Sequence, residues 1–306
     1  MKKKFGDRRD SKRVKVDGLH QLCIDLKPRR CDADVYINQS IDVTNLIKYI
    51  EKKKKENPDM RITYFHAFTM AFAKLFYNRE LLNRFICDRK TYRRNDVVIA
   101  FVAKIAFNDS SEEVMINLKV DKDDTLESIA KKISKRVNKV RTSKQTDKKE
   151  NTNNAVDVIG HMPGIIRIPL VGFIKWLDKK GWIPSSLVDD NIYYSTVILS
   201  NLGNLGIGSI YHNLTNFGTS SMLATMGKIH KETKIDEDGK TKVIDVCDFG
   251  VNMDERIADG YYFAKSLKMF EYILSKPELL EERADTKIDY EEEWRKNNRQ
   301  KTRKNK

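Results

Sequence analysis

The sequence predicts an α/β sandwich built around a mixed β-sheet, and three observations lead to this fold class. Some segments space their apolar residues as an amphipathic helix does, while others alternate apolar and polar residues or run apolar without a break, as strands do. The two kinds of segment do not alternate strictly, whereas a Rossmann-type sheet requires strand and helix to alternate. The chain has 306 residues, of which 40% are hydrophobic, enough for one large domain or two small ones.

The first half of the chain predicts three strands and three helices. Residues 34–42 alternate apolar and polar positions, which is typical of a half-buried strand. The next helix places Leu46, Ile47 and Ile50 on one face and ends before Pro58, because proline cannot continue a helix. In chain order we expect strand 34–42, helix 43–57, buried helix 63–77, strands 97–106 and 114–120, helix 126–140 with Asp124 and Thr125 as caps, and a lysine-rich linker at 141–154.

The second half predicts a helical insertion and then a return to strands. Residues 155–184 contain two apolar helical pieces, which Pro163 and Pro169 interrupt. The elements expected beyond the insertion are strands 194–199, 221–226 and 242–252, with a turn at 236–239, and a final helix, 257–275, ending near Pro277. The domain organisation that we expect is a basic disordered arm at 1–16, a single domain at 17–285 that includes the insertion, and a charged tail at 286–306.

The net charge of +14 is concentrated at the two ends of the chain. Residues 1–16 carry a net +6 and residues 295–306 a net +7, which leaves +1 for residues 17–294. Basic ends of this kind are usually solvated arms that can contact anionic surfaces non-specifically. Phe5 and Trp294 are the only aromatic residues in or beside them, so no recognition motif is present. We therefore expect no specific nucleic-acid partner.

The cysteines indicate neither a metal site nor a redox motif. Cys23, Cys31, Cys87 and Cys247 show no CxxC spacing and no paired histidine ligands. Scattered cysteines without a signal peptide are typical of a reducing cytoplasm. Residues 192–227 contain no charged residue, but asparagines and glycines break the segment, and these would be costly in lipid. We therefore expect a cytoplasmic protein without a transmembrane helix.

Three segments carry the most specific pattern in the chain. The first is helix 63–77 leading into Glu80-Leu-Leu-Asn-Arg-Phe-Ile86. The second is Ile198-Leu-Ser-Asn-Leu-Gly203, followed by the small-residue run 217–227. The third is Asp254-Glu-Arg-Ile-Ala-Asp-Gly260, which precedes the last helix. Each segment alone is common, and their specificity comes from the order in which they occur.

In this order the three segments resemble the catalytic domain of the dihydrolipoyl acyltransferases, the core subunits of 2-oxoacid dehydrogenase complexes, whose fold chloramphenicol acetyltransferase shares. The likeness spans roughly residues 34–280. It implies a two-layer α/β sandwich of the chloramphenicol acetyltransferase type that assembles as a homotrimer. It also implies active sites at subunit interfaces, where coenzyme A (CoA) or acyl-CoA and the acyl acceptor enter a channel from opposite ends. The insertion and both basic ends depart from the family pattern, and no lipoyl domain is recognised in this chain.

The resemblance also assigns roles to residues. Acyl transfer to a thiol or hydroxyl needs a base for the acceptor's proton and a donor for the oxyanion of the tetrahedral intermediate. By position, Ser200 matches the family's oxyanion donor, and Asn201 follows it in the turn. Asp259 matches the motif aspartate and Arg256 the arginine. Their spacing lets these two residues pair locally, and Asp259 also stands where it can cap the last helix.

Glu255 occupies the position of the family's catalytic histidine. A carboxylate with an ordinary pKa near 4.3 is a weak base for a thiol with a pKa near 8.5. Burial could raise the carboxylate pKa and make Glu255 serviceable as the base. The alternative is a catalytically inactive pseudoenzyme, a trimeric ligand-binding or assembly protein whose motif persists because it builds the fold.

The apolar insertion at 155–184 leaves several interpretations open. Aliphatic and aromatic residues alternate there with Arg167, Lys175, Lys179 and Lys180. Such a helical pair most often packs on its own body or on a neighbouring subunit. It could also cover the channel mouth, line an acyl-chain pocket or rest on a membrane surface.

Overall fold

The computed structural model describes residues 8–58, 60–104, 113–145, 158–184, 188, 191–235 and 239–291. The strands are β1 (Ser11–Arg13), β2 (Asp34–Asp42), β3 (Arg84–Cys87), β4 (Lys90–Arg94), β5 (Val97–Lys104), β6 (Glu113–Val120), β7 (Val197–Asn201), β8 (Met222–Ile235) and β9 (Thr241–Asp254). The helices are α1 (Gly18–Leu26), α2 (Thr44–Glu56), α3 (Tyr64–Asn78), α4 (Leu126–Gln145), α6 (Gly164–Lys180) and α8 (Gly260–Ser275).

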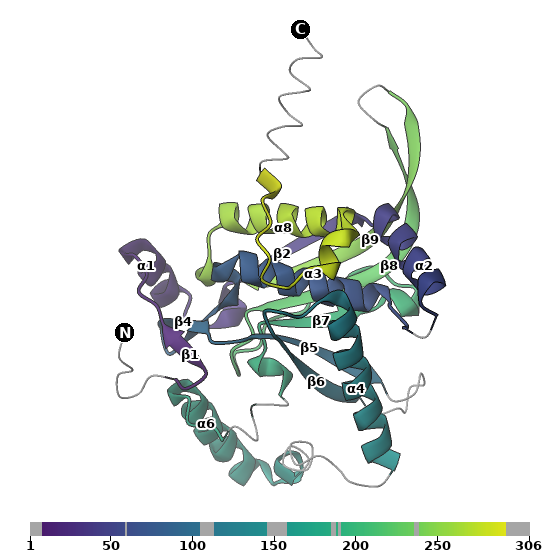
Figure 1. Ribbon diagram of the computed structural model, residues 1–306. Helices are drawn as coiled ribbons and strands as arrows, with labels where there is room; N and C mark the ends of the chain where they lie inside the picture. The colour runs from purple at the N-terminus through teal and green to yellow at the C-terminus, as the bar shows by residue number, and fades with distance from the viewer. Residues whose placement is uncertain are drawn as a thin grey trace.

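Six strands form one mixed sheet in the order β2-β9-β8-β7-β5-β6, and a smaller sheet has the order β1-β4-β3. In the large sheet β7 runs parallel to both of its neighbours, β5 and β8, while the other neighbouring pairs are antiparallel. The outer half of the β8–β9 ribbon extends beyond the body (Figure 1). Among the described residues no helix is long and apolar enough to cross a membrane.

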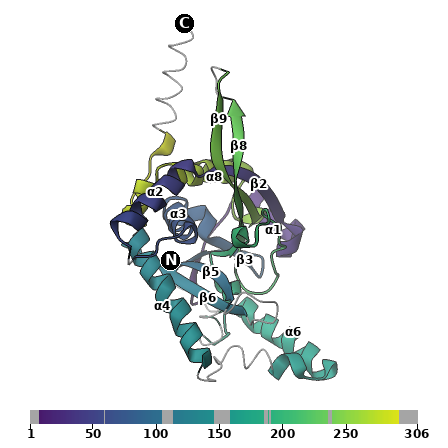
Figure 2. The same cartoon turned by 90° about the vertical axis from the view of Figure 1, so that its right-hand side faces the viewer.

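Helices α2, α3, α4 and α8 cover one face of the large sheet (Figure 2). The core between the two layers is aromatic: the ring of Phe72 lies 4.6 Å from that of Phe270, which lies 5.2 Å from that of Phe249 on β9. Burying rings of this size supplies much of the stabilisation of a core. The predicted two-layer α/β sandwich with a mixed sheet is therefore confirmed.

The opposite face of the large sheet is free of this helical layer and is more polar. Alternation along β7 sends Val197 and Leu199 to the helical core and Ile198 to a small cluster with Ala100 on the other side. Ser200, two residues after Ile198, therefore also lies on the face away from the helices. This face holds the polar groups that the sequence motifs single out.

Most of the long periodic segments form as predicted. Residues 34–42 are β2, and α2 and α3 lie within one residue of the predicted 43–57 and 63–77. Thr63 begins α3 through a reciprocal capping box with His66. The strand predicted at 221–226 begins one residue later and continues to Ile235 as β8, and the strand predicted at 242–252 lies within the longer β9. Of the turn predicted between them, residues 236–238 lie outside the described residues.

Three predicted boundaries are wrong. Residues 192–194 form a 3-10 turn that the Asn191 side chain caps, so β7 begins at Val197 rather than at 194. The helix α4 continues to Gln145 and includes the start of the predicted linker, of which residues 146–154 lie outside the described residues. The last helix begins at Gly260 rather than at 257 because Asp259 is its N-cap.

Pro169 does not interrupt the insertion: it lies inside one continuous helix, α6. A proline inside a helix lacks the N–H that here would have bonded the carbonyl of Ile165, and its ring crowds that carbonyl. That turn is open to solvent, since Ile165 is 85% exposed, and water can satisfy the carbonyl. The break predicted at Pro163 does occur, because α6 begins directly after it.

The disordered arm predicted at 1–16 is wrong for its second half. Residues 11–13 pair with β4, and Arg8 is buried. The Arg8 guanidinium is tolerated there because its Nη2 lies 2.9 Å from the Asp10 carboxylate and its Nη1 donates to the carbonyl of Asp178 on α6. Residues 1–7 and 292–306 lie outside the described residues, so the remainder of both predicted tails stays a prediction.

Candidate functional site

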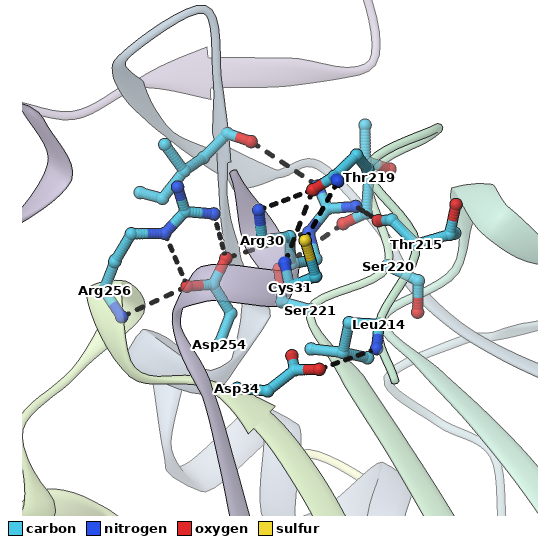
Figure 3. Close-up of polar contacts among 12 residues, drawn as sticks. Arg30, Cys31, Asp34, Leu214, Thr215, Thr219, Ser220, Ser221, Asp254 and Arg256 are labelled. Atoms are coloured by element: carbon cyan, nitrogen blue, oxygen red, sulfur yellow. Dashed lines mark hydrogen bonds and ion pairs between the residues drawn. The ribbon is translucent and has the colours of Figure 1, made fainter. Parts of the chain in front are cut away.

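A buried ion pair stands where β9 ends. Asp254 is fully buried, and its two carboxylate oxygens accept from Nε and Nη2 of Arg256, each at 2.7 Å (Figure 3). Arg256 Nη1 donates to the carbonyl of Lys27 at 2.7 Å. The bidentate geometry is the strongest form of a carboxylate–guanidinium contact. The pairing of Arg256 with Asp259 predicted from the sequence is therefore wrong, because Asp254 lies on the buried face of β9 and takes the guanidinium instead.

A second buried arginine shares this carboxylate. Arg30 Nε lies 3.7 Å from Asp254 Oδ2. The Arg30 guanidinium also donates to the carbonyls of Thr215 at 2.6 Å and Gly218 at 3.2 Å (Figure 3). Burial lowers the pKa of Arg30, and the Asp254 charge opposes that shift. The network thus fixes the segment 214–218 to the end of β9.

Asp34 on β2 adds a second acid to the network. It is the direct register partner of Asp254, and its Oδ2 accepts from the Leu214 backbone N–H at 2.9 Å (Figure 3). Burial raises the pKa of Asp34, and the neighbouring Asp254 charge adds to that shift. The other oxygen, Oδ1, is buried without a hydrogen-bond partner among the described residues.

Glu255 follows this network and points to a different partner. Its carboxylate forms an ion pair with the ammonium of Lys27, the residue that ends α1, and its backbone N–H donates to the Ala33 carbonyl at 3.0 Å. The Glu255 side chain is 37% exposed. Hydrogen bonding to Glu255 raises the pKa of Lys27. The carboxylate is therefore neither fully desolvated nor free of a counter-charge.

Asp259 is the N-cap of α8, as the sequence predicts. Its side chain is exposed and accepts from the Tyr262 backbone N–H at 2.7 Å. This contact satisfies one of the amide donors that every helix leaves unpaired at its first turn. The role is structural and does not depend on any reaction.

Ser200 lies near the end of β7, on the sheet face away from the helices. It is half-buried, and its register partner Thr225 is fully buried, with a hydroxyl that has no hydrogen-bond partner among the described residues. Asn201 closes the turn after the strand, because its Oδ1 accepts from the Gly203 backbone N–H at 3.1 Å. The hydroxyl of Ser200 is thus placed at a sheet surface rather than used in the turn.

A single chain does not bring Ser200 and Glu255 together. Ser200 pairs with Thr225, which in turn pairs with Gly250 on β9. Glu255 lies five residues beyond Gly250, and a strand rises by about 3.3 Å per residue, so roughly 16 Å along the strands separates the two groups. Two strand spacings across the sheet add to this. A site that uses both groups needs a second chain.

The sequence indicated neither Lys27, Arg30 nor Asp34. These charged residues belong to a run, Leu26-Lys-Pro-Arg-Arg-Cys-Asp-Ala-Asp34, that resembles an ordinary polar connection. Their partners lie 180 residues or more further along the chain. A short-range pattern cannot reveal such contacts. The burial of Arg30 sets this run apart from an ordinary polar connection, but it is evident only in the structure.

The buried histidine at the start of α3 is structural. His66 accepts from the Thr63 backbone N–H at 3.2 Å, and burial lowers its pKa to about 4. Among the described residues no group of three or more histidines, cysteines or acids is arranged to hold a metal ion.

Comparison with known proteins connects this geometry with a family. The profile of the 2-oxoacid dehydrogenases acyltransferase (catalytic domain) matches residues 185–281, a range that contains Ser200, Glu255 and Asp259. A comparison with curated protein sequences finds no match.

Solved structures share the fold at low sequence identity. A probable dihydrolipoamide acetyltransferase from Listeria monocytogenes is 18% identical, covers 87% of this chain and 94% of its own, and superposes with a TM-score of 0.56. The dihydrolipoamide acetyltransferase of Azotobacter vinelandii is 15% identical, with coverages of 88% and 93% and a TM-score of 0.58. A chloramphenicol acetyltransferase is 12% identical, with coverages of 86% and 99% and a TM-score of 0.52. The predicted resemblance in fold is confirmed.

Proposed function

We propose that the protein is a CoA-dependent acyltransferase that acts as a homotrimer and moves an acyl group from acyl-CoA to a thiol or hydroxyl acceptor. One observation carries the proposal: the range that matches the acyltransferase catalytic domain, 185–281, contains both Ser200 and the motif 254–260. That range lies within a body that has the fold of dihydrolipoamide acetyltransferases along almost their whole length. Fold alone does not establish an activity, so the site has to be tested directly.

The separation of Ser200 from Glu255 supports an active site between two chains. The surface around Ser200 suits a protein contact, because Val102 and Met115, paired on β5 and β6, are 42% and 43% exposed. Phe101 lies beside Leu199, so Val102 is level with Ser200 on the same face. We place Ser200 of one chain opposite Glu255 of the next.

In the proposed reaction the Glu255 carboxylate takes the proton of the acceptor, whose sulfur or oxygen attacks the thioester carbon. The tetrahedral oxyanion accepts a hydrogen bond from the Ser200 hydroxyl of the neighbouring chain. When the intermediate collapses, the carbon–sulfur bond breaks, and the CoA thiolate takes the proton that Glu255 received. The buried Asp254–Arg256 pair and the Asp259 cap position Glu255 on a rigid turn.

Lys27 sets a condition on this mechanism. Its ammonium contacts the carboxylate that has to act as the base. The ammonium therefore occupies a position on the carboxylate at which the acceptor's proton would have to arrive. Turnover with Glu255 as the base therefore needs the acceptor to displace Lys27 or to bind beside it.

The same ion pair favours a second candidate function: a catalytically inactive pseudo-acyltransferase that serves as a trimeric ligand-binding or assembly protein. Here Glu255 joins the C-terminal end of α1 to the motif turn, while Asp254, Arg256 and Asp259 complete the fold. In that case CoA binding and trimer formation can persist without turnover.

The two candidates differ in what Glu255→Gln removes. If Glu255 is the base, the substitution should lower acyl transfer by about 100-fold or more while CoA binding by calorimetry and the trimer mass by sedimentation stay unchanged. Glu278→Gln, which changes an exposed glutamate on the short turn after α8, is the matched control. Saturable CoA binding without turnover in the unaltered protein would support the second candidate. Absence of CoA binding at millimolar concentration would contradict CoA-dependent acyl transfer and leave the non-catalytic assembly protein as the remaining candidate.

We also propose a cytoplasmic location. The four cysteines are free thiols, of which Cys87 and Cys247 are buried. Free cysteines scattered along a chain are typical of proteins in a reducing compartment.

A further inference from the structure

The helix α6 has two unlike faces. With 3.6 residues per turn, Leu170, Ile174 and Leu177 fall on one side and Ile165, Ile168 and Trp176 on the other. The first three are half-buried, whereas Ile165, Ile168 and Trp176 are 85%, 71% and 46% exposed. Most of the helix lies away from the helical layer of the sandwich (Figure 2). We call the second side the outer face of α6.

The inner face holds α6 through Asp178, near its C-terminal end. The buried Asp178 carboxylate accepts from the Tyr194 hydroxyl at 2.8 Å and from the Gly218 backbone N–H at 3.1 Å. Arg8 Nη1 donates to the Asp178 carbonyl at 2.5 Å. Gly181, with φ +66°, ends the helix in the left-handed conformation. These contacts fix the direction in which the outer face points.

The outer face presents large apolar side chains to solvent. Besides the aliphatic residues, Phe173 is 55% exposed and stacks on Trp176 with their ring centroids 5.8 Å apart. Trp182 is 50% exposed and meets Trp176 edge-on at 5.5 Å. Exposed apolar residues are ordinary when single, but a contiguous strip of them marks an interaction surface.

The charged side chains that α6 presents to solvent are positive. Lys175 and Lys179 lie on the outer face on either side of Ile168, and neither has an acidic partner among the described residues. Lys180 lies 3.4 Å from Asp88. The one acid of the helix, Asp178, is turned inward and its oxygens are hydrogen-bonded. The outer face therefore combines apolar and aromatic groups with uncompensated positive charge.

We propose that α6 binds flat on an anionic phospholipid surface. Tryptophan and phenylalanine suit the boundary between headgroups and acyl chains, and the lysines on the same face suit anionic headgroups. A symmetric contact between the outer faces of two copies would instead bring the same lysines together. Because α6 is too short to cross a bilayer, contact along its length is the geometry that buries this strip. The inference does not depend on acyl transfer.

The test is co-sedimentation of the full chain with phosphatidylcholine vesicles that contain or lack phosphatidylglycerol. The protein should bind the anionic vesicles, with a blue shift of tryptophan emission. Lys175→Glu with Lys179→Glu should weaken that binding by about 30-fold or more, since each lysine near an anionic surface contributes about fivefold. Ile168→Ser with Trp176→Ser should weaken it by about tenfold or more. Circular dichroism confirms that the variants fold.

Matched controls separate α6 from charge and exposure elsewhere. Lys54→Glu with Lys55→Glu on α2 makes the same change in net charge, and Ile235→Ser with Val243→Ser removes exposed apolar groups from the β8–β9 ribbon. Three outcomes would overturn the proposal. They are no binding of the unaltered protein, an equal loss in the α2 and α6 charge variants, or a fall in oligomer mass on Ile168→Ser with Trp176→Ser, which would assign the outer face to a second copy.

Discussion

The motif at the end of β9 and the helix α6 differ in what they bury and what they expose. At the motif, a charged side chain is buried and finds counter-charges: Asp254 is fully buried between Arg30 and Arg256. On the outer face of α6, large apolar side chains remain exposed, although Phe173, Trp176 and Trp182 contact one another. The buried ion pairs of the motif are complete within one chain, whereas the outer face of α6 is covered only in the membrane-bound state that we propose. Loss of activity would therefore leave the motif in place.

The largest expected effect is a loss of stability when the buried carboxylate of the motif is removed. Asp254→Ala leaves two buried guanidinium groups without their carboxylate and should lower the free energy of unfolding by about 3–5 kcal/mol. Trp176→Ser on the outer face of α6 is the counterpart and should change it by less than about 0.5 kcal/mol. Urea unfolding of both variants measures the difference. Similar losses would show that α6 contributes as much to the fold as the motif does.

A smaller effect tests whether Asp259 acts only as a cap. Asp259→Ala should lower the free energy of unfolding by about 1 kcal/mol, because the Tyr262 N–H loses its acceptor. Asp259→Asn keeps a capping oxygen and should restore most of that stability. If Asn restored the stability but not the proposed acyl transfer, the aspartate charge would have a role beyond the cap.

The smallest expected effect concerns the charge of Asp34, which lies beside Asp254. The folded-state pKa of Asp34 is raised, so between its unfolded value and that folded value the folded protein binds more protons. Stability contributed by this group is therefore lost as pH rises through that window. Asp34→Asn should stabilise the protein at pH 7 by less than about 1 kcal/mol, and the gain should vanish as pH falls below about 3.9. Urea unfolding across this range tests the sign, and a loss at pH 7 would contradict it.

Periodic segments of the fold could be predicted from the sequence, because their cause is local. The alternation at 34–42 and the apolar helix at 63–77 need only the spacing of neighbouring side chains. The Asp259 cap was equally readable, since its partner Tyr262 lies three residues away. The interruption predicted at Pro169 is wrong, because the carbonyl that loses its hydrogen bond lies in a solvent-exposed turn of α6, where water can replace the bond.

The site was less predictable because its contacts are distant in sequence. Lys27 reaches Glu255 and Arg30 reaches Asp254 across more than two hundred residues. The nearer aspartate competes successfully for Arg256, which the spacing to Asp259 alone could not show. Ser200 is indicated only by the resemblance of its segment to the acyltransferase family. The strand register in the structure shows how far Ser200 lies from Glu255.

Gly218 connects the two regions. Its N–H donates to Asp178 of α6, and its carbonyl accepts from Arg30, which contacts Asp254. No side chain could replace it, because φ is +74° and a Cβ atom would lie 2.3 Å from the Tyr193 carbonyl oxygen. A helix of 17 residues is a lever of about 25 Å, anchored here near one end. A force on the N-terminal end of α6 would therefore act through Asp178 on the two peptide groups of Gly218, and through them on Arg30, which contacts Asp254.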